Sequence, residues 1–239
     1  MGARDVFDEC CERIDEAYRE LGHQLGWRFL TSPRSTFPPS SGILLLTLNP
    51  GGARPRPDHD GPSVEAGSAY LVEDWEPPYS AGRAPLQVQV QQLFDALASD
   101  LSAPADGTEL LNQSLGSYFV PFRSPSLADL RSKAASLEFA ESLWSQILGE
   151  FSPRLVITID HETTTRLRRV LERSGLPLKD ERRYPTGWGN VSAGLSAPET
   201  RGPAVLRLPH LSRYRVFGRP ASRPFMDVLV RAAAQHLAI

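Results

Sequence analysis

The sequence predicts an α/β fold: a three-layer α/β/α sandwich with a central, mainly parallel sheet of about four strands. Short apolar runs alternate with amphipathic helical stretches along the 239 residues. Alternation at these lengths implies right-handed crossovers and a sheet covered by helices on both faces. The chain shows no internal repeat and no interdomain linker. A single domain over residues 1–239 is therefore expected.

The predicted helices rest on apolar residues that recur every three or four positions. Val6, Cys10 and Ile14 begin such a series near the amino terminus. A second clear series includes Leu143 and Ile147. On this basis, helices are expected at residues 4–26, 86–101, 136–151, 162–173 and 222–238.

The predicted strands are short apolar runs that end in turn residues. They are expected at residues 43–48, 118–122, 155–159 and 205–208, with weaker strand signals near 180–184 and 188–195. The intervening segments are a Pro- and Ser-rich connector at 31–42, a polar break at 102–108 and a long Pro- and Gly-rich loop at 49–85. Loops of this length in compact domains are usually lids or binding loops.

Composition excludes several classes of protein. The chain is 41% hydrophobic and 23% charged, as is ordinary for a globular domain. Acidic residues near the amino terminus argue against a signal or transit peptide, and no apolar run approaches the roughly 20 residues of a membrane span. Cys10 and Cys11 cannot build a disulfide framework or a four-cysteine metal site. We expect a cytoplasmic monomer without metal or cofactor, with one thiol on the packed face of a helix and one near its edge.

Charge is distributed unevenly along the chain. The net charge is −2, but residues 201–239 carry seven arginines against one acid, a local charge of +6. Residues 1–20 carry a local charge of −4. Such an uneven distribution of charge can give the protein a basic face that binds DNA. A solvated, Arg-rich helix flank is the alternative.

Polar residues follow three of the predicted strands. Asn49 comes after the first strand, followed by Pro50, Gly51 and Gly52; Tyr118 to Arg123 surround the second strand, and His210 follows the last. The carboxyl ends of parallel strands form the usual ligand site of such sheets, and glycines let a ligand approach the backbone closely. We therefore expect Asn49 to be presented rather than packed. A simple turn residue and a structural histidine are the alternatives for Asn49 and His210.

These segments resemble the uracil-DNA glycosylase superfamily. Segment 48–51, Leu-Asn-Pro-Gly, is similar to the Gly-x-Asn-Pro-Gly motif of the mismatch-specific and single-strand-selective branches, with Thr47 in place of the first Gly. Segment 120–125 resembles the part that follows the family's base-reading strand. Segment 210–212, His-Leu-Ser, resembles the second motif, His-Pro-Ser. The resemblance covers roughly residues 40–238, with 1–40 as an amino-terminal helix and connector and 41–239 as the catalytic core.

The resemblance implies a monofunctional DNA glycosylase, which hydrolyses the N-glycosidic bond of a flipped-out pyrimidine without a metal or cofactor. It implies that the Asn49 carbonyl oxygen holds the attacking water. His210 would donate a hydrogen bond to the departing base, an oxyanion-type stabilisation. The residues expected around the base are Leu48, Pro50, Gly51, Gly52, Trp75, Tyr79, Ser117 and Tyr118.

Departures within the motifs suggest which class of base is bound. Tyr118 or Ser117 stands where family members usually place an Asn that reads the pyrimidine edge. Gly51 and Gly52 leave room where the strict uracil branch blocks the C5 position with a Tyr. Uracil or a C5-substituted pyrimidine, such as a hydroxymethylated or glycosylated cytosine of phage DNA, is therefore expected. Trp75 and Tyr79 are candidates for stacking on the flipped base, or alternatively anchors of a lid.

The loop after His210 is expected to contact DNA. In the family, the equivalent loop enters the minor groove, where arginines serve phosphates and an apolar or aromatic side chain wedges between bases. The DNA-contacting residues are expected to be Arg123, Ser212, Arg213, Tyr214, Arg215 and Arg219, with Tyr214 or Val216 as the wedge. An exposed Arg-rich turn is the alternative. His59 is expected at a solvated loop tip, and His161 at a helix cap.

The sequence lacks the motifs of nucleotide-binding domains and serine hydrolases. The sequence has no G-x-G-x-x-G, no phosphate-binding G-x-x-x-x-G-K-[ST] and no G-x-S-x-G nucleophile elbow. No lysine lies in these loops, so Schiff-base strand cleavage is not expected. The alternative from a different class is a catalytically silent DNA-binding or sensor protein with the same fold.

Overall fold

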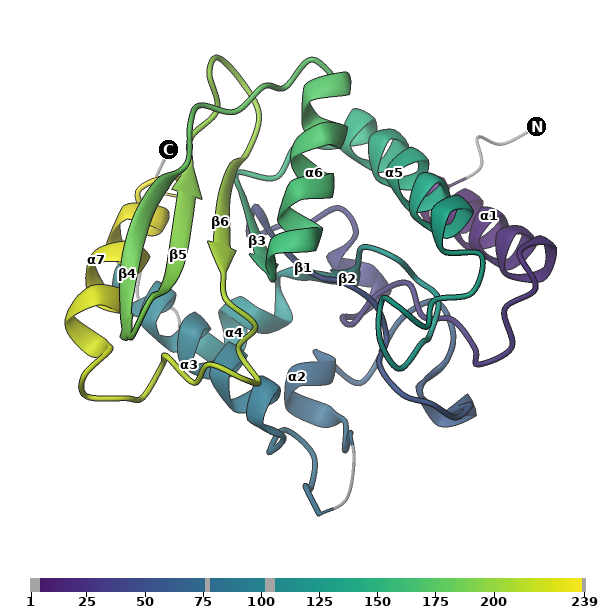
Figure 1. Ribbon diagram of the computed structural model, residues 1–239, viewed down its shortest axis with the longest axis horizontal. Coiled ribbons are helices and arrows are strands. Elements are labelled where there is room, and N and C mark those ends of the chain that lie inside the picture. Colours follow the sequence, from purple (N-terminus) through teal and green to yellow (C-terminus); the bar gives the residue numbers. More distant parts are fainter. Residues whose placement is uncertain (1–4, 76–77, 102–105, 238–239) are drawn as a thin grey trace.

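The computed structural model describes residues 5–75, 78–101 and 106–237, and its centre is a mixed sheet of six strands in the order β2-β1-β3-β6-β5-β4 (Figure 1). The strands are β1 (Ile43–Thr47), β2 (Leu115–Tyr118), β3 (Leu155–Ile159), β4 (Arg182–Trp188), β5 (Val191–Ser196) and β6 (Ala204–Leu208). The strands β2, β1, β3 and β6 are parallel, whereas β5 and β4 continue the sheet as an antiparallel hairpin. The predicted α/β class is confirmed. The sheet has six strands rather than about four, because both weak strand signals form strands.

Helices cover both faces of the sheet, as Figure 1 shows. One face carries α2 (Ala69–Val72), α3 (Pro85–Ser99), α4 (Gly107–Asn112) and α7 (Arg223–Ala234); the other carries α1 (Val6–Glu20), α5 (Lys133–Glu150) and α6 (His161–Arg173). Ile43 and Leu45 pack into the first layer, whereas Leu44 and Leu46 pack into the second. This alternation explains why β1 is buried at every position and apolar from Ile43 to Leu46. No helix among the described residues is long and apolar enough to span a bilayer.

Several helix boundaries differ from the sequence prediction. The first helix ends at Glu20 rather than near residue 26, because Gly22 adopts a left-handed φ of 72° that terminates it. Helix α4 was missed: the predicted polar break at 102–108 includes only its first two residues, and no element was predicted for residues 109–112. The Asp106 carboxylate caps this helix by accepting a 2.7 Å hydrogen bond from the Glu109 backbone N–H. The spacing Asp-x-x-Glu was the sequence signal for this start.

The second strand lies three residues earlier than predicted, and the amino-terminal segment 27–31 covers its edge. The Thr31 N–H donates to the Gly116 carbonyl at 2.8 Å, and the Arg28 N–H donates to the Pro121 carbonyl at 2.9 Å. A Cβ on Gly116 would lie 2.4 Å from the Thr31 hydroxyl oxygen, so only glycine permits this approach. The amino-terminal region is therefore part of the same core, and it brings Arg28 towards the strand ends.

Both cysteines lie on α1. Cys10 is buried in the layer shared with α5, whereas Cys11 is half-buried. The expectation of one packed thiol and one near the helix edge is confirmed. Burial raises the pKa of Cys10 to about 11, so this thiol stays protonated at neutral pH.

Candidate active site

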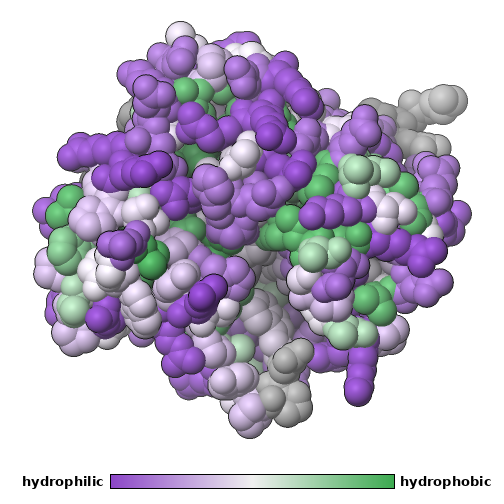
Figure 2. Space-filling view, viewed as in Figure 1, coloured by the Kyte–Doolittle hydropathy of each residue, from purple (hydrophilic) through white to green (hydrophobic). Residues whose placement is uncertain are grey.

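The parallel strands β1, β3 and β6 end at the same edge of the sheet, so the residues that follow them lie at equivalent positions along the strand direction. The register pairs Leu46 with Thr158, and Thr158 with Arg207. Three residues beyond these positions come Asn49, His161 and His210. Since β3 alone separates β1 from β6, their backbones lie roughly 10 Å apart. Figure 2 shows this face hollowed near its middle, beyond the carboxyl ends of β3 and β6 as they lie in Figure 1.

The side-chain amide of Asn49 is held in one orientation. Its nitrogen donates to the Pro50 carbonyl and the Ser124 hydroxyl, both at 2.9 Å. It also lies 3.3 Å from the Ser124 carbonyl and 3.4 Å from the Phe122 carbonyl. Carbonyl oxygens accept only from the NH₂ end of an amide, so these contacts fix which end faces the protein. The carbonyl oxygen of Asn49 is therefore turned away from this cluster of acceptors.

Arg123 clamps the Asn49 loop instead of lying on the surface. Its guanidinium donates to the Gly51 carbonyl at 2.8 Å and pairs with the Asp60 carboxylate at 2.9 Å. The side chain is 6% exposed. The expectation that Arg123 contacts DNA is therefore wrong, because its charge is used inside the protein.

The Gly51 position is open. A Cβ built on Gly51 meets no atom within 4 Å, and this residue is exposed. Gly52 is half-buried and has a φ of 116°, a backbone conformation that residues other than glycine rarely adopt. Pro50 is buried beneath them and Leu48 is half-buried. The segment thus packs against the protein at Pro50 and leaves open space at Gly51.

His210 is exposed, and its ring is oriented by its own loop. The Ser212 hydroxyl lies 2.8 Å from Nδ1. The His210 carbonyl accepts from the N–H groups of Arg213 and Tyr214 at 3.0 and 2.9 Å, which makes a tight turn. Leu211 is fully buried and anchors this turn in the core, in the position where the His-Pro-Ser motif that the segment resembles has a proline.

Only one of the two wedge candidates is accessible. Val216 is fully buried, so it cannot insert between bases. Tyr214 is half-buried, and Arg213 and Arg215 are exposed on the same loop. Tyr214 therefore remains the wedge candidate.

Asp160 follows β3, between the strands that lead to Asn49 and His210, and sequence reasoning missed it. Its φ of 136° and ψ of 166° fall in a region that is essentially restricted to glycine. Its carboxylate accepts from the Thr163 N–H and hydroxyl, both at 2.7 Å, and so caps α6. The cap is Asp160 and not His161. Burial raises the pKa of Asp160, while the Thr163 hydrogen bonds and the positive form of His210 lower it.

A buried polar cluster holds the long loop against the ends of β1 and β2. Arg28 and Glu73 form an ion pair of 2.5 Å, with side chains 5% and 13% exposed. The other Glu73 oxygen accepts from the Trp75 indole N–H at 3.1 Å. His59 Nδ1 lies 3.9 Å from that oxygen, and the His59 side chain is 12% exposed. The expectation of His59 at a solvated loop tip is therefore wrong. Burial lowers the pKa of His59, and Glu73 partly offsets that effect.

Trp75 and Tyr79 lie in different surroundings. The Trp75 ring meets Tyr70 edge-on, with centroids 5.2 Å apart, and its N–H is bound by Glu73. These contacts fit the lid-anchor alternative for Trp75. Tyr79 is 40% exposed. Positions 76–77 between them lie outside the described residues.

Ser117 and Tyr118, the two candidates for reading the base edge, are distinguished by their contacts. Ser117 is buried, and its hydroxyl donates to the Phe29 carbonyl at 2.7 Å. Tyr118 is half-buried at the end of β2. Burial raises the pKa of Tyr118 to about 12, with Arg28 lowering it and Glu73 raising it. Tyr118 therefore keeps its hydroxyl proton at neutral pH and can both donate and accept a hydrogen bond.

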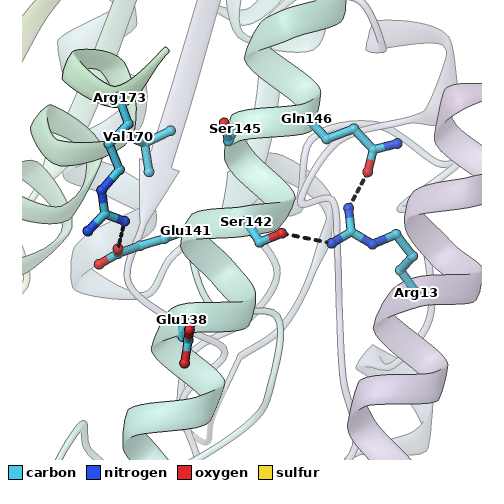
Figure 3. Close-up of a pocket in the computed structure, with 8 residues that line it drawn as sticks. All are labelled: Arg13, Glu138, Glu141, Ser142, Ser145, Gln146, Val170 and Arg173. Carbon is cyan, nitrogen blue, oxygen red and sulfur yellow. Dashed lines mark hydrogen bonds and ion pairs between the residues drawn. The ribbon is translucent and has the colours of Figure 1, made fainter.

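A groove lies elsewhere, among α1, α5 and α6 (Figure 3). It has a volume of about 460 Å³. Both of its arginines bind other lining side chains: Arg13 binds Gln146 and Ser142, and Arg173 pairs with Glu141 at 2.9 Å. These mutual contacts leave it a weaker candidate than the strand ends.

No protein-family model matches the chain, and no curated protein matches it. Among residues 5–75, 78–101 and 106–237, no three His, Cys, Asp or Glu side chains are grouped so that they could hold a metal ion. The candidate site therefore rests on the geometry of the strand ends.

Proposed function

We propose that the chain is a monofunctional DNA glycosylase that hydrolyses the N-glycosidic bond of a flipped-out pyrimidine and leaves an abasic site. The proposal rests above all on one observation: the fixed amide of Asn49 and the oriented imidazole of His210 follow strands that end level at one sheet edge. The resemblance of the two surrounding motifs to uracil-DNA glycosylases supports it. In this proposal the chain is a cytoplasmic monomer, and its partner is DNA.

The proposed chemistry assigns the water to Asn49. Its side-chain carbonyl oxygen accepts a hydrogen bond from a water molecule and aims the water oxygen at C1′ of the sugar. The C1′–N bond breaks with its electron pair going to the base, the water oxygen bonds to C1′, and the proton that the water loses passes through solvent to the base anion. Because an amide is a weak base, the intrinsic rate is expected to be modest.

The departing base is assigned to His210. We assign the Ser212 hydroxyl as the donor to Nδ1, 2.8 Å away, which puts the ring proton on Nε2. Nε2 can then donate to the base carbonyl as negative charge develops. Tyr118 replaces the family's Asn at the base edge, and its neutral hydroxyl can pair with either a donor or an acceptor. The open space at Gly51 favours a C5-substituted pyrimidine alongside uracil. The role would be base-excision repair or defence against phage.

The test is release of free bases from DNA panels. Duplex and single-stranded oligonucleotides carry uracil, thymine mismatches, or hydroxymethylated and glucosylated cytosine, and released bases are identified by mass spectrometry. We expect one class of base to be released, with matching alkali-labile breaks that Asn49→Ala abolishes. Absence of release from every substrate would overturn the proposal.

The second candidate is a catalytically silent DNA-binding or sensor protein with the same fold. Two departures favour it: Tyr118 stands in the base-reading position, and Leu211 replaces the motif proline as a buried anchor. The same panel separates the two functions. Tight binding of modified DNA without any break would indicate the sensor.

A further inference from the structure

The β4–β5 hairpin turn packs against the loop after His210. The Arg219 guanidinium donates to the Gly187 carbonyl at 2.6 Å and lies 4.6 Å above the Trp188 ring centroid. A Cβ on Gly187 would lie 2.3 Å from the Ala221 carbonyl oxygen. This close packing joins two segments that are distant in sequence at the sheet edge that carries His210 (Figure 1).

Four side chains from these segments form what we call the Arg–aromatic row: Arg213, Tyr214, Trp188 and Arg219. The Arg213 guanidinium lies 5.4 Å from the Tyr214 ring centroid, and Tyr214 meets Trp188 edge-on at 6.2 Å. The row thus runs from the His210 turn to the hairpin. Sequence reasoning missed Trp188, because only the fold brings this residue beside the loop.

The surroundings of the row are positively charged. Arg213 and Arg215 are exposed, and no acidic residue occurs between residues 201 and 226. Gly189 and Asn190 at the hairpin turn are exposed next to Trp188. Two neighbouring aromatic rings flanked by arginines suit a nucleic-acid strand, since guanidinium groups bind phosphates and rings contact bases.

We propose that the β4–β5 turn and the loop 212–219 form one surface that binds a single strand of DNA beside the target nucleotide, with Trp188 positioning Arg219 and Tyr214. The inference rests on the proposed function for its ligand, DNA, and it adds the hairpin as a contact surface. The loop is anchored independently of Trp188, because Gln89 exchanges hydrogen bonds of 2.8 and 2.9 Å with Phe217. Loss of the indole ring should therefore weaken binding without unfolding the loop.

The test is equilibrium binding of a fluorescent single-stranded oligonucleotide of ordinary bases, measured by anisotropy over a series of salt concentrations. We expect Trp188→Ala and Arg219→Gln to weaken binding about tenfold, and Trp188→Phe to stay near wild type. Each lost phosphate contact should reduce the salt slope by roughly 0.7. Arg201→Gln is the matched control: Arg201 is exposed at the opposite sheet edge, between β5 and β6, and its loss changes the net charge equally.

Wild-type affinity in both Trp188→Ala and Arg219→Gln would overturn the inference, as would an equal loss in Arg201→Gln. If Trp188→Ala does not fold, as judged by circular dichroism, Arg219→Gln decides the outcome. Displacement of the DNA by a polyglutamate peptide at equal concentration would indicate an acidic protein partner instead. The proposed glycosylase function is tested separately, because His210→Ala should retain binding while losing base release.

Discussion

The side-chain nitrogen of Asn49 lies 2.9 Å from the hydroxyl oxygen of Ser124. This contact joins the loop after β1 to the segment after β2, and the Ser124 N–H returns a 3.1 Å hydrogen bond to the Pro50 carbonyl. The amide that is assigned to the attacking water is thus oriented by a second loop. Changing Ser124 therefore tests the orientation of Asn49 without removing Asn49 itself.

Replacing Ser124 with Ala should lower turnover about tenfold and leave KM nearly unchanged, because the backbone carbonyls still hold the amide nitrogen loosely. Asn49→Ala should lower turnover by roughly 10²–10³. Single-turnover formation of alkali-labile sites measures both effects. Ser145→Ala is the control, since Ser145 is exposed on α5 and contacts only the surface residue Ser174 among its described hydrogen bonds. Equal rates for Ser124→Ala and wild type would show that the hydroxyl does not orient Asn49.

His210→Ala should lower turnover by roughly 10²–10³, as expected for loss of one donor to a developing oxyanion. Ser212→Ala should cost about tenfold, because the imidazole loses the partner that holds its tautomer and orientation. Both variants are compared under single-turnover conditions. A Ser212→Thr variant retains a hydroxyl and should recover most of the rate. If Ser212→Thr is as slow as Ser212→Ala, the hydroxyl is not the relevant group.

Gly51→Tyr should shift the choice of base. A side chain at this position enters open space, so the fold should tolerate the substitution. The added ring would occupy the volume proposed for a C5 substituent, and release of C5-substituted pyrimidines should fall at least tenfold relative to uracil. Gly51→Ala, which adds one methyl group, should change the ratio less. An unchanged ratio in Gly51→Tyr would place the C5 side of the base elsewhere.

The sequence predicted the layered fold because its central strands are short and mostly apolar runs. Ile43 and Leu44 illustrate this: they pack into opposite layers, so neither face could be polar. The second strand was placed wrongly because residues 118–122 are more apolar than the true strand. Gly116 weakens the pattern of that strand, yet its lack of a side chain is what admits Thr31.

The strand-end positions of Asn49 and His210 were predictable, since each follows an apolar run. Arg28, Glu73, Asp160 and Trp188 were not, because their surroundings depend on contacts between distant segments. Arg28 and Glu73 are 45 residues apart in sequence. Asp160 offered a local signal, an Asp three residues before Thr163 at a helix start, but its strained backbone is visible only in the structure.

His23 should make stability depend on pH. Its ring stacks on Phe122 at 4.1 Å and lies 2.9 Å from the Ser136 hydroxyl. Burial, and to a lesser extent Arg131, lowers the pKa of His23 to about 4 from 6.5. Between these values the unfolded chain binds a proton that the folded chain does not, so stability falls as the pH drops from 6.5 to 4, by at most roughly 3 kcal/mol.

Denaturant unfolding at several pH values tests this dependence. His23→Gln, which can still bond Ser136, should flatten the decline between pH 6.5 and 4. His161→Gln is the control, because His161 is exposed on α6. If His23→Gln follows the wild-type slope, other groups dominate acid unfolding.

Asp160 should show opposite effects on stability and activity. Asn can accept the same hydrogen bond from the Thr163 N–H, so Asp160→Asn retains the helix cap. It also removes a carboxylate whose charged form burial disfavours, as its raised pKa indicates. This variant should therefore melt at the wild-type temperature or above it at pH 7. Strained residues that persist beside a site are commonly kept for function, so turnover should fall at least tenfold. A variant that is both as stable and as active as wild type would reduce Asp160 to a cap, whereas loss of stability alone would mean that the charge supports the fold.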